Sequence, residues 1–236
     1  MMSKIDFLNS REKWLKEVAA KCHEYATNEK YNNDRDFYVF QTNSDVCQPH
    51  ILLIGINPGG NATYSSRRET LMAEKGCDRR TWEDLESDPK TLYEKPQWEI
   101  DYKEKGADVM RSRLKLLFYN DELNSILKKT MMMNSIYFNT KNEKELDQIS
   151  PEIKNYCNQK TLEFIEIAKP KNVIFWSSEK KLKKLGITNF IQINPLIKTA
   201  KFNETNINVI PHYSYFGAYG YEKAKLMGDT LLEILK

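Results

Sequence analysis

The sequence has no apolar run long enough to cross a lipid bilayer. Its apolar stretches, such as Ile51–Ile54 and Met131–Met133, are far shorter than the roughly 20 residues that a transmembrane helix needs. The first residues carry charge and contain no apolar signal segment, so we expect a cytoplasmic protein with no membrane partner. With 40% hydrophobic and 29% charged residues, the composition is typical of a folded globular protein.

Cysteine and histidine, the residue types that most often bind zinc, are scarce and do not have the spacing of a known metal site. The four cysteines, Cys22, Cys47, Cys77 and Cys157, include no CxxC pair, and the chain has only three histidines. These spacings resemble neither a zinc site nor a disulfide framework. We therefore expect free thiols, no metal and no cofactor.

The sequence also lacks a charge excess and the common nucleotide-binding loops. Lys and Arg outnumber Asp and Glu by 36 to 33, a balance that is compatible with nucleic-acid binding but does not argue for it. Gly55 and Gly60 have the spacing of a phosphate-binding loop, but Asn61 stands where that loop has lysine. Asn57 likewise interrupts a dinucleotide-binding GxGxxG pattern.

Hydrophobic patterning predicts strands that alternate with helices. This order is typical of an α/β protein whose mostly parallel sheet has helices on both faces. No linker or repeat divides the chain, so we expect a single domain over residues 1–236, with short helices in a long insertion, 61–107. The predicted helices cover residues 4–29, 108–127, 151–169, 178–185 and 221–236, and the predicted strands cover 36–41, 50–56, 130–134, 172–176, 190–193 and 207–210.

Polar side chains stand at the carboxyl ends of several predicted strands, where open α/β sheets bind ligands. They are Asn57, Asn134, Ser177, Ser178, His212, Tyr213 and Ser214. Pro58 and the neighbouring glycines form a rigid turn that holds the Asn57 amide in one orientation. An asparagine removes no proton at neutral pH, but it can orient a water molecule.

Three segments at these strand ends resemble the motifs of the uracil-DNA glycosylase superfamily, in the family's order. They are GINPGG (55–60), MMMNS (131–135) and VIPHYS (209–214). The likeness covers roughly residues 50–60 and 108–236. It implies a three-layer α/β/α fold with a central, mostly parallel four-stranded sheet. Asn57 together with His212 is similar to the single-strand-selective monofunctional type.

The resemblance implies a reaction, hydrolysis of the N-glycosidic bond of uracil or a related deaminated base in DNA, as in base excision repair. The base leaves the stack to be reached. By this likeness Asn57 places the water, His212 donates a hydrogen bond to the base carbonyl oxygen where negative charge grows, and Asn134 reads O4 and N3–H of the base. The implied protein is a monomer that binds DNA.

The resemblance also assigns supporting residues. Gly55, Ile56, Pro58 and Gly59 line the substrate site, Tyr64 takes the base-stacking place by position, and Ser214 with the Gly59 and Gly60 amides holds phosphates. Tyr215 or Phe216 wedges into the space of the flipped nucleotide.

The chain departs from the family at several positions. Tyr213 replaces a proline, and Asn57 replaces the aspartate of the most active members. Cys157 falls near one iron–sulfur ligand position, but Phe138 occupies another, so we expect no cluster. Two alternatives stay open: a nucleic-acid-binding protein with little catalysis, and an enzyme that acts on a small nucleoside or base.

Overall fold

The computed structural model describes residues 3–42, 44–66, 109–128 and 130–235. Their contacts divide the chain into two compact units. Unit 1 combines the described parts of residues 1–47, 56–94 and 133–168, and unit 2 those of 48–55, 95–132 and 169–236. Most of the expected insertion, residues 67–107, lies outside the described residues, and the single domain stays a prediction.

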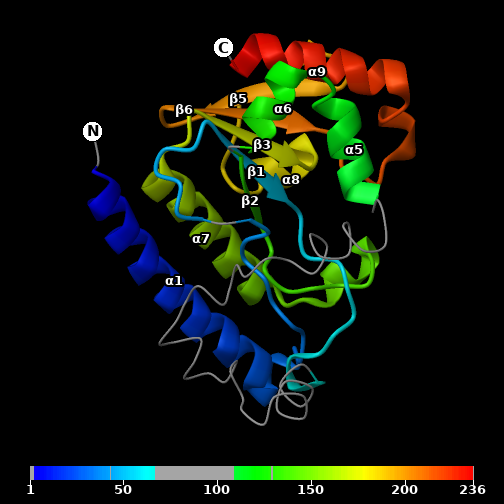
Figure 1. Cartoon of the computed structure of the whole chain (residues 1–236). Helices are drawn as coiled ribbons and strands as arrows, with labels where there is room; N and C mark the ends of the chain where they lie inside the picture. Colours follow the sequence, from blue (N-terminus) through cyan, green and yellow to red (C-terminus); the bar gives the residue numbers. More distant parts are fainter. Residues whose placement is uncertain (1–2, 43, 67–108, 129, 236) are drawn as a thin grey trace. The chain divides into compact units, whose positions relative to one another are not determined.

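Within the described residues, six strands form one sheet in the order β2-β1-β3-β6-β5-β4 (Figure 1). In its centre β3 pairs in parallel with both β1 and β6, whereas β5 pairs antiparallel with β6 and β4. The strands are β1 (Ile51–Gly55), β2 (Met131–Asn134), β3 (Asn172–Trp176), β4 (Ile191–Asn194), β5 (Ile197–Phe202) and β6 (Thr205–Ile210).

The chain is thus an α/β protein with a mostly parallel sheet flanked by helices, and the expectation of four strands is wrong. The difference lies at the edge formed by β5 and β4. Asn194 turns the chain back, because its Oδ1 accepts the backbone N–H groups of Leu196 and Ile197. β5 then completes hairpins on both sides.

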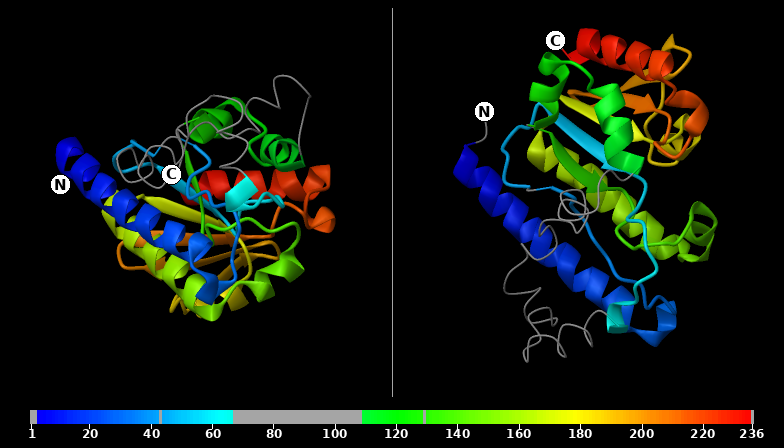
Figure 2. Two further views of the ribbon diagram at one scale, coloured as in Figure 1. Left: turned by 90° about the horizontal axis from the view of Figure 1, so that it is seen from below. Right: turned by 45° about the vertical axis from the view of Figure 1, so that its right-hand side comes forward.

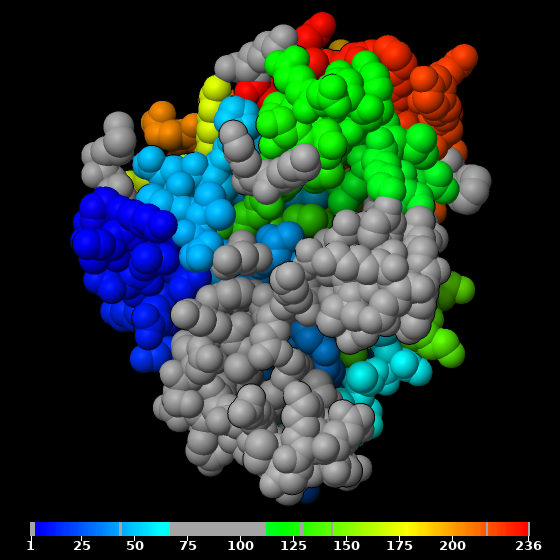
Figure 3. All heavy atoms as spheres, in the orientation of Figure 1, coloured from blue at the N-terminus to red at the C-terminus, as the bar shows by residue number. Residues whose placement is uncertain are grey.

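Unit 2 contains α5 (Val109–Leu117), α6 (Asp121–Lys128), α8 (Glu179–Lys183), the short 3-10 helix η4 (Phe216–Ala218) and α9 (Tyr221–Leu235). Figure 3 shows the surfaces of α5 and α6, in green, beside that of α9, in red. The expected single helix over 108–127 is two helices, because the Asn120 side chain accepts the Leu123 N–H and caps α6. The apolar core of this unit includes Ile51, Leu53, Leu117, Ile174, Trp176, Met227 and Leu231.

Gly228 marks a close approach between α9 and the C-terminal end of α5. A Cβ atom at Gly228 would clash with the Leu117 carbonyl oxygen and lie 3.3 Å from the Tyr119 ring. We expect Gly228→Ala to lower the free energy of unfolding by about 1–3 kcal/mol, because overpacking outweighs the better helix propensity of alanine. Urea denaturation measures the change. Glu233→Ala, at an exposed position of α9, is the control, and equal midpoints for both variants would contradict the expectation.

Unit 1 is built on two long helices, α1 (Lys4–Thr27) and α7 (Pro151–Ala168), which run side by side (Figure 2). Both helices begin at a serine cap as the sequence dictates, since Ser3 Oγ accepts the Asp6 N–H and Ser150 Oγ accepts the Ile153 N–H. The unit also contains the 3-10 helices η1 (Glu29–Tyr31) and η3 (Glu143–Gln148). None of the helices in the described ranges is both long and apolar enough to span a membrane.

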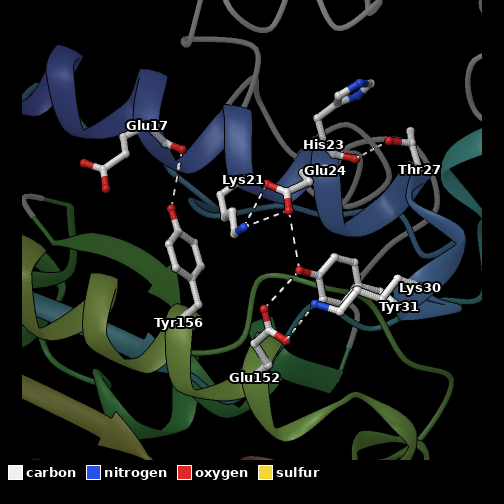
Figure 4. A network of polar contacts seen from close by, with 9 residues as sticks. All are labelled: Glu17, Lys21, His23, Glu24, Thr27, Lys30, Tyr31, Glu152 and Tyr156. Atoms are coloured by element: carbon white, nitrogen blue, oxygen red, sulfur yellow. Dashed lines mark hydrogen bonds and ion pairs between the residues drawn. The ribbon is translucent and has the colours of Figure 1, made fainter.

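Polar contacts on the surface join the ends of α1 and α7 (Figure 4). The Tyr31 hydroxyl lies 3.0 Å from Glu152 Oε1 and 3.4 Å from Glu24 Oε1, and its one proton is shared between these two acceptors. The Tyr156 hydroxyl donates to the Glu17 carbonyl oxygen. Exposed contacts of this kind contribute little to stability.

Burial separates the thiols of unit 1 into two classes. Cys22 and Cys157 are fully buried, and burial raises the pKa of both thiols, that of Cys157 to about 12. Cys47 is only partly buried. Because the thiolate is the reactive form, we expect a disulfide reagent at pH 8 to modify Cys47 quickly and the other two only after unfolding. The titration is made in Cys77→Ser, since residue 77 lies outside the described ranges. Rapid modification of all three thiols would contradict it.

Candidate functional site

The first two motif segments lie side by side in unit 1. The Ile136 N–H donates to the Ile56 carbonyl oxygen at 2.8 Å, and the Thr140 N–H donates to the Pro58 carbonyl oxygen at 3.1 Å. In return the Gly60 N–H donates to the Thr140 carbonyl oxygen at 3.1 Å. The structure thus places Asn57 beside the segment that follows Asn134. The expected meeting of the polar side chains at the strand ends stays a prediction.

The Asn57 amide is held by the segment beside it. Its Nδ2 donates to the Pro58 carbonyl oxygen at 2.8 Å, to Thr140 Oγ1 at 2.9 Å and to the Phe138 carbonyl oxygen at 3.3 Å. Carbonyl oxygens only accept hydrogen bonds, so the nitrogen must face them and Oδ1 is turned away. Asn57 is half-buried, and no residue in the described ranges hydrogen-bonds to Oδ1. The arrangement leaves an oriented acceptor.

A hollow of ≈ 280 Å³ adjoins this segment. Gly60 forms part of the wall of the hollow. Its φ is +137°, a backbone conformation that residues other than glycine rarely adopt. The Gly60 N–H is already bonded to Thr140, so a phosphate contact through that amide would exchange one hydrogen bond for another. The hollow is lined by polar and charged residues, namely Asp34, Arg35, Asn61, Asn139, Lys141 and Glu145, together with Gly60, Ala62, Thr63 and Thr140.

Asn134 ends β2 and is fully buried. Its Nδ2 donates to the Tyr38 carbonyl oxygen at 3.2 Å, and its Oδ1 accepts a hydrogen bond from Gln41 Nε2 at 2.9 Å. Both ends of the amide are therefore engaged. Sequence reasoning missed Gln41, although one signal was present: Gln41 is the last residue of the predicted strand 36–41, as polar as the other strand ends. That segment forms isolated bridges at Phe37 and Phe40 instead of a strand.

Tyr64 packs into the interior of unit 1. Its ring stacks on Phe37 with the centroids 5.5 Å apart and the planes at 18°. The Tyr64 hydroxyl lies 3.2 Å from His23 Nδ1. Tyr64, to which the resemblance assigns base stacking, therefore stacks on Phe37 of the same unit.

His212 belongs to unit 2 and follows β6. Its Nδ1 lies 2.7 Å from Ser214 Oγ and accepts the Ser214 N–H at 3.3 Å. Because a backbone N–H can only donate, Nδ1 is an acceptor and the neutral ring carries its proton on Nε2. This tautomer can donate a hydrogen bond to a carbonyl oxygen. The Tyr213 ring lies 4.2 Å from that of His212 and 5.3 Å from that of Trp176.

The remaining predicted site residues fall in both units. Gly55 ends β1, and Gly59 bridges Thr140 with open space where a Cβ atom would lie. The Tyr215 side chain is 64% exposed, as a wedge requires. Phe216 begins η4, but its side chain lies outside what the structure describes.

No protein-family model matches the chain, and no curated protein matches it either. Among the residues that the structure describes, no group of three or more His, Cys, Asp or Glu side chains is placed to hold a metal ion.

Proposed function

We propose that the chain is a DNA glycosylase that hydrolyses the N-glycosidic bond of uracil or a related deaminated base. The observation that carries the proposal is the Asn57 amide, whose nitrogen is held by three oxygen acceptors while its oxygen is left unbonded by the described residues. An acceptor oriented in this way can hold one water proton and direct a lone pair of that water towards the sugar. The resemblance of the three motif segments supports the same function.

The chemistry follows from the groups present. As the bond between sugar and base breaks, its electron pair leaves with the base, and positive charge grows on the sugar. Water held by Asn57 then adds to the anomeric carbon. Its proton passes to solvent water, because an asparagine side chain cannot take it, and the departing base anion takes up a proton from solvent. His212 donates through Nε2–H to the base carbonyl oxygen, where it stabilises the negative charge.

The fold and the partner of the enzyme are part of the same proposal. The sheet is the middle layer of a three-layer α/β/α fold, and DNA is the partner. The enzyme acts as a cytoplasmic monomer without a metal or an organic cofactor. The target base leaves the stack, and the exposed Tyr215 ring fills the space that it vacates.

Release of base from synthetic oligonucleotides tests the proposal. Single- and double-stranded oligonucleotides with one uracil are incubated with the protein, cleaved with alkali at abasic sites and resolved on a gel. We expect cleavage at the uracil position and none in an oligonucleotide with cytosine there. Binding without release of uracil, hypoxanthine or xanthine would favour the nucleic-acid-binding alternative, and neither binding nor release would favour a small nucleoside.

His212→Ala is expected to slow base release about 100-fold, the usual cost of removing one donor at a developing oxyanion. Ser214→Ala removes a hydroxyl that contacts His212 Nδ1 and that the resemblance assigns to phosphate binding, and we expect less than a tenfold effect. Single-turnover rates measure both. A rate for His212→Ala equal to that of the unmodified protein would remove His212 from the mechanism.

A further inference from the structure

Gln41 contacts Asn134 from a segment outside the three motifs. Its neighbour Phe40 forms an isolated bridge with Met133, so the backbone brings position 41 beside the end of β2. Gln41 Nε2 donates to Asn134 Oδ1 at 2.9 Å. Asn134 is fully buried, whereas Gln41 is half-buried. Of these two carboxamides, Gln41 is the one that can reach a ligand.

One carbonyl group sets the orientation of both carboxamides. The Tyr38 carbonyl oxygen can only accept, so the Asn134 nitrogen faces it and Asn134 Oδ1 is directed to Gln41. An acceptor requires a donor, so the Gln41 nitrogen faces Asn134. This leaves Gln41 Oε1 and one N–H, and neither bonds to a residue in the described ranges.

We infer that Gln41, held in one orientation by Asn134, reads the base, an inference that rests on the proposed glycosylase function. Its remaining acceptor and donor complement an N–H beside a C=O. That pair is the lactam edge that deamination creates in uracil and in hypoxanthine. Cytosine and adenine present the reverse pair, a ring-nitrogen acceptor beside an amino donor.

A free carboxamide can bind either edge, because a half-turn exchanges its donor and acceptor. Gln41 cannot make that turn without placing Oε1 against Asn134 Oδ1, which would lose the hydrogen bond and oppose two acceptors. Because the contact with Asn134 prevents this half-turn, the Gln41 carboxamide can bind the lactam edge but not the reverse pair. In this arrangement Asn134 is a positioning residue, and Gln41 is the residue that touches the substrate.

The test compares binding of two single-stranded oligonucleotides that resist hydrolysis, one with 2′-fluoro-deoxyuridine and one with 2′-fluoro-deoxycytidine. Fluorescence anisotropy gives both affinities. We expect Gln41→Met, which keeps the side-chain length and removes the donor and acceptor, to reduce the preference for uracil at least tenfold. Affinity for an unmodified oligonucleotide should stay within about twofold. Gln159→Met, at an exposed position of α7, is the matched control.

A second variant decides the matter if Gln41→Met does not fold. Gln41→Glu keeps the shape but places an acceptor against Asn134 Oδ1, and it should lose the uracil preference as well. A folded Gln41 variant that keeps the full preference, in a protein that releases uracil, overturns the role of Gln41 alone. A chain that neither prefers nor releases uracil overturns the proposed function and this inference together.

Discussion

Asn57→Ala is expected to lower the rate of base release about 1,000-fold, the upper end of what loss of one oriented polar group costs an enzyme. The variant removes the only protein group that the proposal assigns to the attacking water. Single-turnover release of uracil measures the rate, and anisotropy measures DNA affinity, which should change less than threefold. A variant that keeps a tenth of the activity would show that Asn57 does not position the water.

The structure supplies a graded control for this prediction. Thr140 Oγ1 is one of the three acceptors that hold the Asn57 nitrogen. Thr140→Val removes that acceptor while keeping the shape, and we expect about a tenfold loss of activity. Thr140→Ser keeps the hydroxyl and should retain most of it. A damaged fold would lower both variants together, whereas loss of amide orientation lowers only the valine variant.

Asn57→Asp keeps the shape of the side chain and replaces its amide with a carboxylate, so it tests the effect of negative charge at this position. The three atoms that face the Asn57 nitrogen include two carbonyl oxygens, so a carboxylate in the same place meets repulsion and its pKa rises. An acid whose pKa is raised by folding binds more protons in the folded state than in the unfolded state. Stability of this variant therefore falls relative to the unmodified protein as pH rises from about 4 towards 7. Urea unfolding at pH 5 and pH 7.5 detects the difference.

Local patterns sufficed for much of the fold. The predicted strand 172–176 coincides with β3, and the serine and proline at 150–151 place the start of α7 correctly. These elements are defined by continuous apolar runs and capping residues, which act over a few positions. β5 was missed because its sequence, IKTAKF, mixes lysine and threonine with apolar residues. Its strand conformation depends on pairing with β6 and β4, which no local pattern contains.

The candidate site, like the fold, could be predicted from local sequence only in part. Asn57 lies beside the segment that follows Asn134, whereas the meeting of the polar side chains at the strand ends stays a prediction. The partners of the two amides could not be predicted, because Thr140 and Gln41 acquire their positions through tertiary contacts. In particular, isolated bridges and the backbone hydrogen bonds of Tyr38 and Val39 join residues 37–41 to the end of β2 and the segment after it. Packing against the rest of unit 1 adds to these contacts in placing Gln41.

Trp14 is central to that packing, and Trp14→Ala is expected to lower the free energy of unfolding by about 3–5 kcal/mol. The side chain is 2% exposed. Its ring centroid lies 4.9 Å from that of Phe164 and 5.9 Å from that of Phe40, and Nε1 donates to the Lys160 carbonyl oxygen. Replacement leaves a large cavity and removes that donor. Urea denaturation followed by circular dichroism measures the loss.

Trp14→Phe provides the control, because it keeps one aromatic ring and removes only part of the indole volume together with the donor to Lys160. We expect a loss of about 1–2 kcal/mol, because the cavity is smaller than in the alanine variant and the Nε1 hydrogen bond is lost. The two variants should also differ in function. Phe40 contacts Trp14 and immediately precedes Gln41, so the cavity in Trp14→Ala frees the segment that holds the Gln41–Asn134 pair.

Selectivity for uracil over cytosine should therefore fall in Trp14→Ala at temperatures where the variant remains folded, although Trp14 is no part of the proposed site. Trp14→Phe should keep it. Hydrogen exchange at the backbone amide of Tyr38, which donates to the Tyr137 carbonyl oxygen, reports the loosening directly and should be faster in the alanine variant only. Equal protection in both variants would show that the segment 37–41 is held by contacts other than Trp14, and α1 would then support the fold without supporting the site.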